Sequence, residues 1–185
     1  TLNNQETLLL SATKVGEYGT NVCNKILQNY YIKNKNLPYM TIGNINYYLG
    51  DKIIFNHNNY DTETTYYNGD FGTIIGFKNG RIQIESYDKI IDLPHKYFSD
   101  IELAYAITIH KSQGSEKDNI VILLSEEYVS MLSPELLYTA ITRAKKSVRL
   151  LIQGKSLEKI QIYNYKNRNS VLSDKLQGKQ FEIIV

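Results

Sequence analysis

Two short segments of this chain carry the side chains that could do chemistry. The first, residues 108–116 (Thr-Ile-His-Lys-Ser-Gln-Gly-Ser-Glu), places hydroxyl, imidazole, ammonium, amide and carboxylate groups within nine residues. It follows directly on a strand-like run, and α/β folds build their sites at the carboxyl ends of strands. Such a segment can bind a phosphodiester backbone and also reach a nucleotide. The alternative is a solvated polar loop without a ligand.

The second segment is an apolar helical run that ends in cations, at residues 136–146 (Leu-Leu-Tyr-Thr-Ala-Ile-Thr-Arg-Ala-Lys-Lys). A guanidinium on a rigid element suits a phosphoryl-transfer transition state, because it is always charged and binds two oxygens at once. Cations are also favoured at the carboxyl end of a helix for purely structural reasons. We therefore take Arg143 as the candidate catalytic residue and expect a structural role for Lys145 and Lys146.

The elements that would position these segments follow an α/β pattern. A buried parallel strand is predicted at 6–12, and a Gly-containing turn leads from it into a helix that begins at Thr20. That helix is indicated by apolar residues at i+4 spacing, with Thr20 as a candidate N-cap. The residues that carry the repeat are Val22, Ile26 and Tyr30.

The pattern returns after residue 101. Strands are predicted at 103–107, 119–124 and 147–152, and a helix is predicted at 155–164. The helix between the last two strands has Ser133 as its N-cap and Pro134 at its first position, and it is expected to run through Ala144.

The middle of the chain predicts a small β-barrel. Short alternating runs are separated by turn dipeptides such as Asn68-Gly69 and Asn79-Gly80, which are typical of hairpins. We divide the chain into four parts on this basis. They are a first α/β segment at 1–46, the barrel at 47–100, a second α/β segment at 101–165 and a C-terminal tail at 166–185.

Composition excludes several classes of protein. The 185 residues suffice for one domain with a small insert, and they contain no apolar run near the roughly 18 residues that cross a bilayer. A net charge of +2 does not by itself indicate a nucleic-acid partner. The single cysteine, Cys23, excludes an internal disulfide, fits the cytoplasm and is expected in the core. The start has no secretory signal and no Met, so we expect residue 1 to lie inside a longer protein.

Several strings together resemble one enzyme family. AYAITIHKSQGSE resembles motif V, and LLYTAITRAKK motif VI, of superfamily 1 helicases of the RecD type. Upstream, LLLSATKVGEYGTNVCNKILQ is similar to motif IV, and GDKIIFNHNNYD with YYNGDFGTIIGF is similar to that family's SH3-like insert. RNSVL at 168–172 is similar to the closing segment. The resemblance covers about residues 8–175.

The resemblance implies a fold and a set of roles. The chain would be the second, RecA-like motor domain of an ATP-dependent 5′-to-3′ DNA helicase or translocase, a parallel-sheet domain of the P-loop NTPase type interrupted by the SH3-like barrel. Arg143 would be the arginine finger, and Gln113, Gly114 and Glu116 would lie near the nucleotide. The contacts to single-stranded DNA would come from Thr108, His110 and Lys14.

The family's ATP loop has no full counterpart here. The pattern G-x-x-x-x-G-K-[ST] is approached only by Gly154-Lys155-Ser156, and Arg149 stands where the first glycine is needed. ATP and Mg²⁺ would therefore be bound mainly by an upstream motor domain of the same protein, and the isolated chain is predicted to be inactive. No metal site is expected in this chain.

Two alternatives stay open. The chain could be a non-catalytic module that binds protein or nucleic acid through its barrel, on a relic helicase scaffold. It could also be the corresponding part of a viral or relaxase-linked helicase. The residues alone decide neither DNA against RNA nor the repair or recombination pathway served, and no membrane partner is expected.

Overall fold

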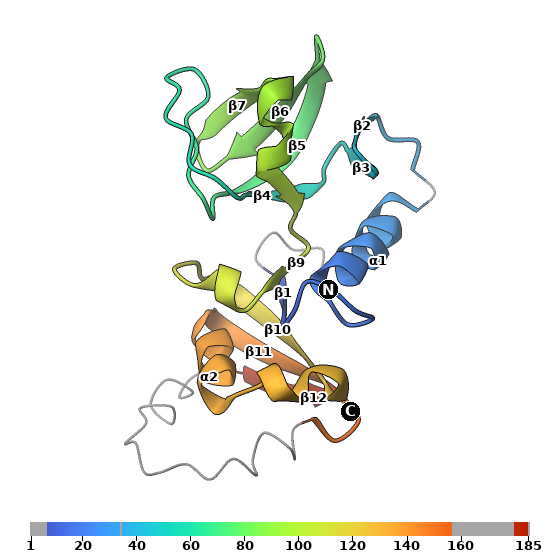
Figure 1. Ribbon diagram of the computed structural model, residues 1–185, viewed down its shortest axis with the longest axis vertical. Helices are drawn as coiled ribbons and strands as arrows, with labels where there is room; N and C mark the ends of the chain where they lie inside the picture. Colours follow the sequence, from blue (N-terminus) through green and yellow to red (C-terminus); the bar gives the residue numbers. More distant parts are fainter. Residues whose placement is uncertain (1–6, 34, 157–179, 185) are drawn as a thin grey trace. The chain divides into compact units, whose positions relative to one another are not determined.

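The computed structural model describes residues 7–33, 35–156 and 180–184. The chain forms two compact units, each built around its own sheet (Figure 1). The first unit combines the two ends of the chain, Thr1–Cys23 and Ala106–Val185, and the second is the intervening segment Asn24–Tyr105. The chain thus leaves the first unit once and returns to it once.

The first unit is built on a five-stranded sheet in which every strand runs parallel to its neighbours. Leu8, Leu9 and Leu10, on one of its inner strands, are all buried, as expected for a strand covered on both faces. The predicted α/β class with a parallel sheet is confirmed. In spatial order the strands are β12 (Gln180–Ile184), β11 (Ala144–Gln153), β10 (Lys117–Ser125), β1 (Thr7–Ser11) and β9 (Ala106–Thr108).

Helix α2 (Pro134–Thr142) packs against β10 and β11. Its start is as predicted, because the Ser133 hydroxyl accepts a hydrogen bond from the Leu136 amide at 3.1 Å and Pro134 occupies the first position. Two 3-10 helices complete the described part of this unit, η2 (His110–Ser112) and η3 (Glu126–Met131).

The end of α2 differs from the prediction. The helix ends at Thr142, with Arg143 as its C-cap, and does not reach Ala144. Ala144 opens β11 instead, so Lys145 and Lys146 lie on a strand and not at a helix end. Apart from Lys155 and Ser156, the helix predicted at 155–164 lies outside the described residues, as does the whole segment 168–172.

Helix α1 (Thr20–Ile32) confirms the predicted helix but buries a different face. Ile26 and Tyr30, which carry the apolar repeat, are 61% and 73% exposed. The buried face carries Asn24 and Gln28 instead, whose side-chain amides make hydrogen bonds inside the second unit. Cys23 is buried as predicted, and this burial raises the pKa of its thiol. Within the described residues, no helix is long and apolar enough to span a membrane.

The second unit contains a five-stranded antiparallel sheet around its own apolar core. The predicted hairpin at Asn79-Gly80 is confirmed, and both residues have the positive φ that such a turn requires (51° and 72°). In spatial order its strands are β7 (Lys89–Leu93), β6 (Arg81–Ser86), β5 (Phe71–Lys78), β4 (Lys52–Phe55) and β8 (Ile101–Leu103). A separate hairpin, β2 (Tyr39–Ile42) with β3 (Ile45–Tyr48), and the 3-10 helix η1 (His95–Asp100) complete it.

Two features of this unit were not predicted. The unit is wider than the 47–100 range, because most of α1 and the hairpin at 39–48 belong to it. The single strand predicted at 103–107 is two strands in two sheets, with Ala104 and Tyr105 between them. The apolar run continues across this break because residues 103–107 are buried throughout, and an apolar run alone does not show where one sheet ends and another begins.

A buried carboxylate holds three segments of the second unit together. Asp51, 1% exposed, accepts hydrogen bonds from Gln28 Nε2 at 2.5 Å and from the Tyr48 amide and the Tyr105 hydroxyl, each at 2.8 Å. Burial raises the pKa of this carboxyl, and the three hydrogen bonds oppose that rise. Gln28 lies on α1 and Tyr105 is the last residue of the unit, so Asp51 joins its beginning to its end.

We predict that Asp51→Ala lowers the free energy of unfolding by about 3 kcal/mol, because the Tyr48 amide and the Tyr105 hydroxyl lose their shared acceptor and the Gln28 amide keeps only its bond to the Asn46 carbonyl. Urea unfolding followed by circular dichroism measures this loss. Asp88→Ala, at an exposed turn position, is the matched control and should change stability by less than about 0.5 kcal/mol. Equal losses in the two variants would contradict the role given to Asp51.

Candidate functional site

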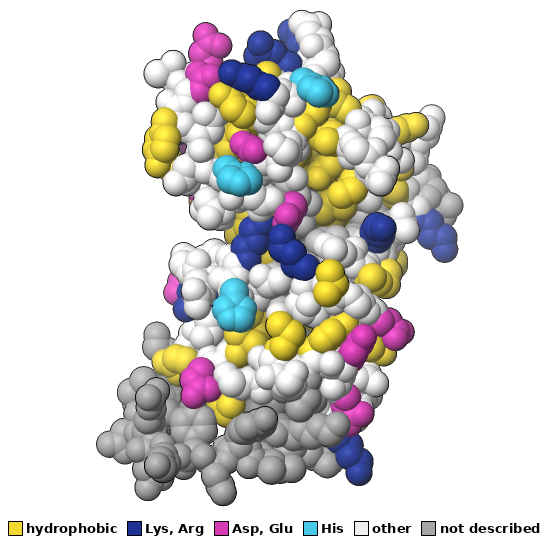
Figure 2. Space-filling view, viewed as in Figure 1, with side chains coloured by type: hydrophobic (Ala, Val, Ile, Leu, Met, Phe, Trp, Pro, Cys, Tyr) yellow, Lys and Arg dark blue, Asp and Glu magenta, His cyan; other side chains and the backbone are white. Residues whose placement is uncertain are grey.

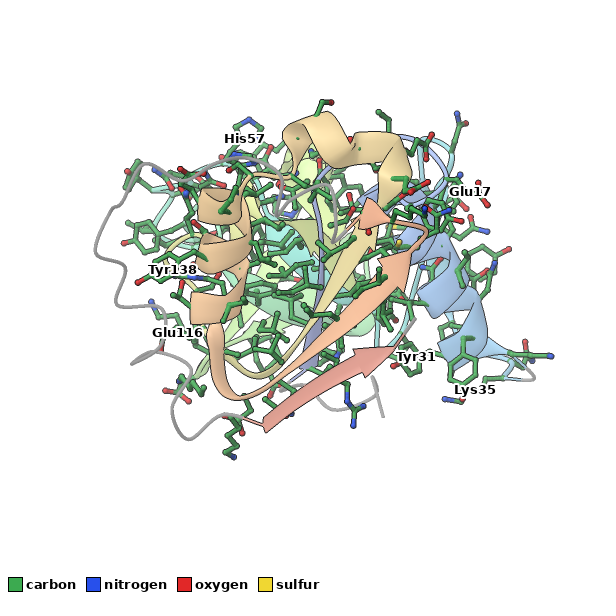
Figure 3. All side chains as sticks on the ribbon, turned by 90° about the horizontal axis from the view of Figure 1, so that it is seen from below. Glu17, Tyr31, Lys35, His57, Glu116 and Tyr138 are labelled. Atoms are coloured by element: carbon green, nitrogen blue, oxygen red, sulfur yellow. The ribbon has the colours of Figure 1, made fainter. Side chains whose placement is uncertain are left out.

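The predicted site residues lie at the two opposite edges of the parallel sheet in the first unit. Thr108 ends β9, and His110 follows it at the carboxyl edge of the sheet. Glu116 immediately precedes β10, and Arg143 immediately precedes β11, so both lie at the amino edge. Figure 3 labels Glu116 on the side of the strand tails and Glu17, from the loop after β1, on the side of the arrowheads.

The carboxyl edge brings two loops side by side. Thr108 pairs with Ser11 in the register of β9 and β1, and the Ile109 amide donates to the Ser11 carbonyl at 3.0 Å. The Thr108 hydroxyl also accepts from the Lys111 amide at 3.3 Å, which fixes the start of η2. His110 is exposed at this point. Thr108 therefore shapes its own loop besides being available to a ligand.

The loop after β1 holds Lys14 in a closed turn. The Thr20 amide donates to the Thr13 carbonyl at 2.9 Å, and the Asn21 amide donates to the Lys14 carbonyl at 3.0 Å. The Ser11 hydroxyl donates to the Tyr18 carbonyl at 2.8 Å, which closes the loop from the strand side. Lys14 itself is exposed at the same edge as Thr108.

Two contacts explain why glycines stand in this loop. Gly16 has a φ of +89°, and a Cβ there would overlap the hydroxyl of Tyr128, which packs on it from η3. A Cβ on Gly19 would overlap the carbonyl oxygen of Val15. The path of the loop past Lys14 therefore depends on glycine at both positions.

The loop 108–116 connects the two edges of the sheet. It spans more than the length of β1, about 13 Å at the usual rise of a strand, because Glu116 lies three residues before the partner of Thr7. Its hydroxyls fold it on itself: Ser112 donates to the Ile109 carbonyl at 2.6 Å, and Ser115 donates to the Ser112 carbonyl at 3.0 Å. Gln113 and Gly114 are exposed at its turn, and Gly114 has a φ of +87°. One ligand atom cannot contact both Thr108 and Glu116 at this separation. The loop nevertheless connects the two residues covalently.

The amino edge places Glu116 beside Arg143. The Lys117 amide, next to Glu116, donates to the Arg143 carbonyl at 3.0 Å. The Arg143 side chain folds back on α2, with Nε donating to the Thr139 carbonyl at 3.2 Å and Nη2 donating to the Thr142 hydroxyl at 3.0 Å. Arg143 is thus fixed through both its backbone and its side chain.

The neighbouring cations differ from Arg143. Lys146 forms a short ion pair with Asp118 of the adjacent strand, and Lys145 is exposed. On the face shown in Figure 2, Lys and Arg side chains are interspersed with Asp and Glu, so charge alone does not mark a ligand surface there. The structural role expected for Lys146 therefore comes from a cross-strand pair, not from a helix end.

The turn at Gly154-Lys155-Ser156 is already filled by a protein carboxylate. The Lys155 amide donates to Glu126 Oε1 at 2.5 Å, and the Glu126 side chain packs on Gly154. The Ser156 hydroxyl donates to the Leu124 carbonyl at 3.2 Å. These donors are directed at the protein itself and not at a phosphate site.

Other titratable groups near one another in sequence have structural contacts. Asp51 is the buried acceptor described above, His57 pairs with Asp100 at 3.4 Å, and Asp61 pairs with Lys96 at 3.8 Å. In the described part of the chain, no group of three or more His, Cys, Asp or Glu side chains is arranged to hold a metal ion.

Two residues that support the site were not found from the sequence. Thr142 touches the Arg143 guanidinium, and its position next to the arginine in a helix was a signal that could have been used. Tyr128 shapes the Lys14 loop by packing on Gly16, and no local pattern connects these two residues.

Comparison with known proteins shows which proteins this chain is similar to. Residues 103–151 match the model of the UvrD-like helicase C-terminal domain. The chain is 34% identical over 144 residues to the RecBCD enzyme subunit RecD of Mycobacterium tuberculosis, across 77% of this chain and 24% of that protein. This chain is homologous to the C-terminal region of RecD-type helicases. The resemblance drawn from the motifs is thereby confirmed.

Other RecD-type and structural relatives agree. The ATP-dependent RecD2 DNA helicase of Deinococcus radiodurans is 32% identical over 96 residues, 52% of this chain and 13% of that helicase. The crystal structure of Bacteroides Pif1 helicase with ADP-AlF3 and single-stranded DNA matches with a TM-score of 0.57 at 19% identity, covering 88% of this chain and 43% of that one. The α/β unit therefore resembles helicase RecA-like domains. The chain spans about a quarter of the length of the RecD relatives.

We predict that Gly16→Ala is far more destabilising than Gly114→Ala, although both glycines have nearly the same positive φ. A Cβ on Gly114 meets open space, so only backbone strain of about 1 kcal/mol is expected. A Cβ on Gly16 must in addition displace Tyr128, which should cost roughly 2 kcal/mol more. Urea unfolding of the two variants measures the difference. Equal losses would show that Tyr128 does not fix the loop.

Proposed function

We propose that this chain is the second motor domain of an ATP-dependent 5′-to-3′ DNA helicase or translocase of the RecD type. The observation that carries the proposal is the placement of Arg143 beside Glu116 at one edge of the sheet, with Lys14 and Thr108 at the other. On this proposal the amino edge faces a nucleotide and the carboxyl edge faces a nucleic acid. Homology to the ATP-dependent RecD2 DNA helicase supports both ligands.

At the amino edge, Arg143 would act as the arginine finger toward ATP held mainly by an upstream motor domain of the same protein. Its guanidinium sits on a rigid helix end and can bind γ-phosphate oxygens with the donors not used by Thr139 and Thr142. Glu116 would lie near the ribose, with Gln113 and Gly114 in the same cleft. Mg²⁺ would be held by the upstream domain and would neutralise charge on the phosphates. On this proposal the isolated chain does not turn over ATP.

At the carboxyl edge, Thr108, His110 and Lys14 would contact the backbone of single-stranded DNA. A hydroxyl, an imidazole and an ammonium are donors that suit phosphate oxygens. These contacts would grip the strand without reading its bases. The loop 108–116 would couple the two edges, so that closure of the motor domains around ATP changes the grip on DNA.

The second unit would be an SH3-like barrel inserted in the motor domain. Its strand order places β4 next to both β5 and β8, the second and the last strands of its sheet, and the 3-10 helix η1 precedes β8. Pairing of the first strand with the last covers the side of β4 that would otherwise be exposed, while β7 and β8 are the outer strands of the sheet. Such a barrel could also recruit a protein partner.

We predict that Arg143→Ala lowers DNA-stimulated ATP turnover of the full-length protein by roughly 10³-fold or more, since arginine fingers contribute on the order of 10³–10⁵. The fold should be intact by circular dichroism. Lys145→Ala, an exposed cation two residues away, is the matched control and should leave turnover unchanged. If the Arg143 variant keeps its turnover, the finger assignment is wrong.

We also predict that Lys14→Ala weakens binding of single-stranded DNA and reduces the slope of log K against log salt by about 1, as loss of one phosphate contact requires. Fluorescence anisotropy with a labelled oligonucleotide at several salt concentrations measures both quantities. Lys25→Ala, an exposed lysine on α1, serves as the control. An unchanged salt slope in the Lys14 variant would remove Lys14 from the DNA site.

A further inference from the structure

Arg143 is held in place by a side-chain contact that its own helix supplies. The guanidinium lies over the last turn of α2, where it bonds to Thr139 and Thr142. We propose that Thr142 is a positioning residue that orients Arg143 for phosphoryl transfer. The inference rests on the proposed function, because it concerns the same arginine.

The geometry is a closed set of three hydrogen bonds. Arg143 Nε donates to the Thr139 carbonyl at 3.2 Å, and Arg143 Nη2 donates to the Thr142 hydroxyl at 3.0 Å. The Thr142 hydroxyl donates its own hydrogen to the same Thr139 carbonyl at 2.8 Å. Since that hydrogen is committed to the carbonyl, the hydroxyl oxygen presents lone pairs to the guanidinium. The Thr142 side chain thus serves as a directed acceptor.

These bonds select one edge of the guanidinium. Nε and Nη2 together form its side edge, and this edge faces the protein. An arginine has five N–H donors in a rigid plane, so fixing the side edge also fixes the direction of its end, formed by Nη1 and Nη2. Nη1 and Nη2 at the end of the guanidinium can then bind two phosphate oxygens, while Nε and Nη2 on its side edge stay bonded to the helix.

The backbone of Arg143 is fixed as well. Its amide donates to the Ala140 carbonyl at 3.2 Å, and its carbonyl accepts from the Lys117 amide at 3.0 Å. The Thr139 hydroxyl donates to the Glu135 carbonyl at 2.8 Å, one turn earlier. With the main chain held on both sides, the orientation of the side chain depends on its bonds to the Thr139 carbonyl and to the Thr142 hydroxyl. Small misplacements of a catalytic group are costly, which makes this hydroxyl a determinant of rate and not of ATP affinity.

The test uses steady-state ATP turnover of the full-length protein with saturating single-stranded DNA. Thr142→Val replaces the hydroxyl by a methyl group of similar shape, and Thr142→Ala removes it without adding bulk. Both should lower kcat about 10-fold while KM for ATP stays within about 2-fold. Thr142→Ser keeps the acceptor and should recover most of kcat. Thermal unfolding by circular dichroism accompanies each variant, and the Ala variant decides if the Val variant is misfolded.

Combination with Arg143→Ala separates this inference from the proposed function. If Thr142 acts only through Arg143, the double variant Thr142→Val with Arg143→Ala should turn over no more slowly than Arg143→Ala alone. Loss of turnover in Arg143→Ala with an unchanged or raised kcat in Thr142→Ala would overturn the positioning role and leave the finger assignment intact. A Ser variant as impaired as the Ala variant would also overturn it. Full turnover in Arg143→Ala would instead overturn the proposed function.

Discussion

The parallel sheet that carries the candidate site depends on the inserted second unit, Asn24–Tyr105, holding its own two ends together. Strand β1 lies between β10 and β9, which follow it only after the chain has passed through the whole second unit. The two ends of that unit are joined by a hydrogen bond from Asn24 Nδ2 to the Leu103 carbonyl at 3.1 Å. Asp51 joins the same two ends a second time, because its carboxylate accepts hydrogen bonds from both Gln28 and Tyr105. Without these buried polar contacts, the pairing of β1 with strands so distant in sequence would carry a larger entropic cost.

The parallel sheet carries two groups of candidate residues. One group lies at the carboxyl ends of its strands and the other at the amino ends. The short β9 sets the loop 108–116 against the end of β1, and the loop then runs along the sheet to the start of β10. There it meets Arg143 through the Lys117 amide. The loop 108–116 is the covalent link between these two edges, which the proposed function assigns to a nucleotide and to DNA. Homology to RecD-type helicases is consistent with the proposed function of these two edges.

Much of the fold follows from local patterns in the sequence. Continuous apolar runs predict the buried parallel strands, Ser133 and Pro134 predict the start of α2, and Asn79-Gly80 predicts a hairpin. The buried face of α1 could not be predicted, because its amides find their acceptors far along the chain while the apolar repeat faces solvent. The division of 103–107 between two sheets was missed for a related reason, since both halves are buried. The candidate site residues were chosen from the motifs and stay a prediction, whereas their placement at two edges of the sheet could be read only from the strand register.

The central claim is that Arg143 acts on a nucleotide bound elsewhere while Thr108 and His110 hold DNA at the opposite edge of the sheet. A structure of the full-length protein with ADP, aluminium fluoride and single-stranded DNA tests it most directly. The account predicts an Arg143 Nη atom about 3 Å from a fluoride or phosphate oxygen, with DNA phosphates at a similar distance from Thr108 or His110. It would be contradicted by an ordered nucleotide with Arg143 beyond hydrogen-bonding distance, or by DNA bound at the amino edge of the sheet.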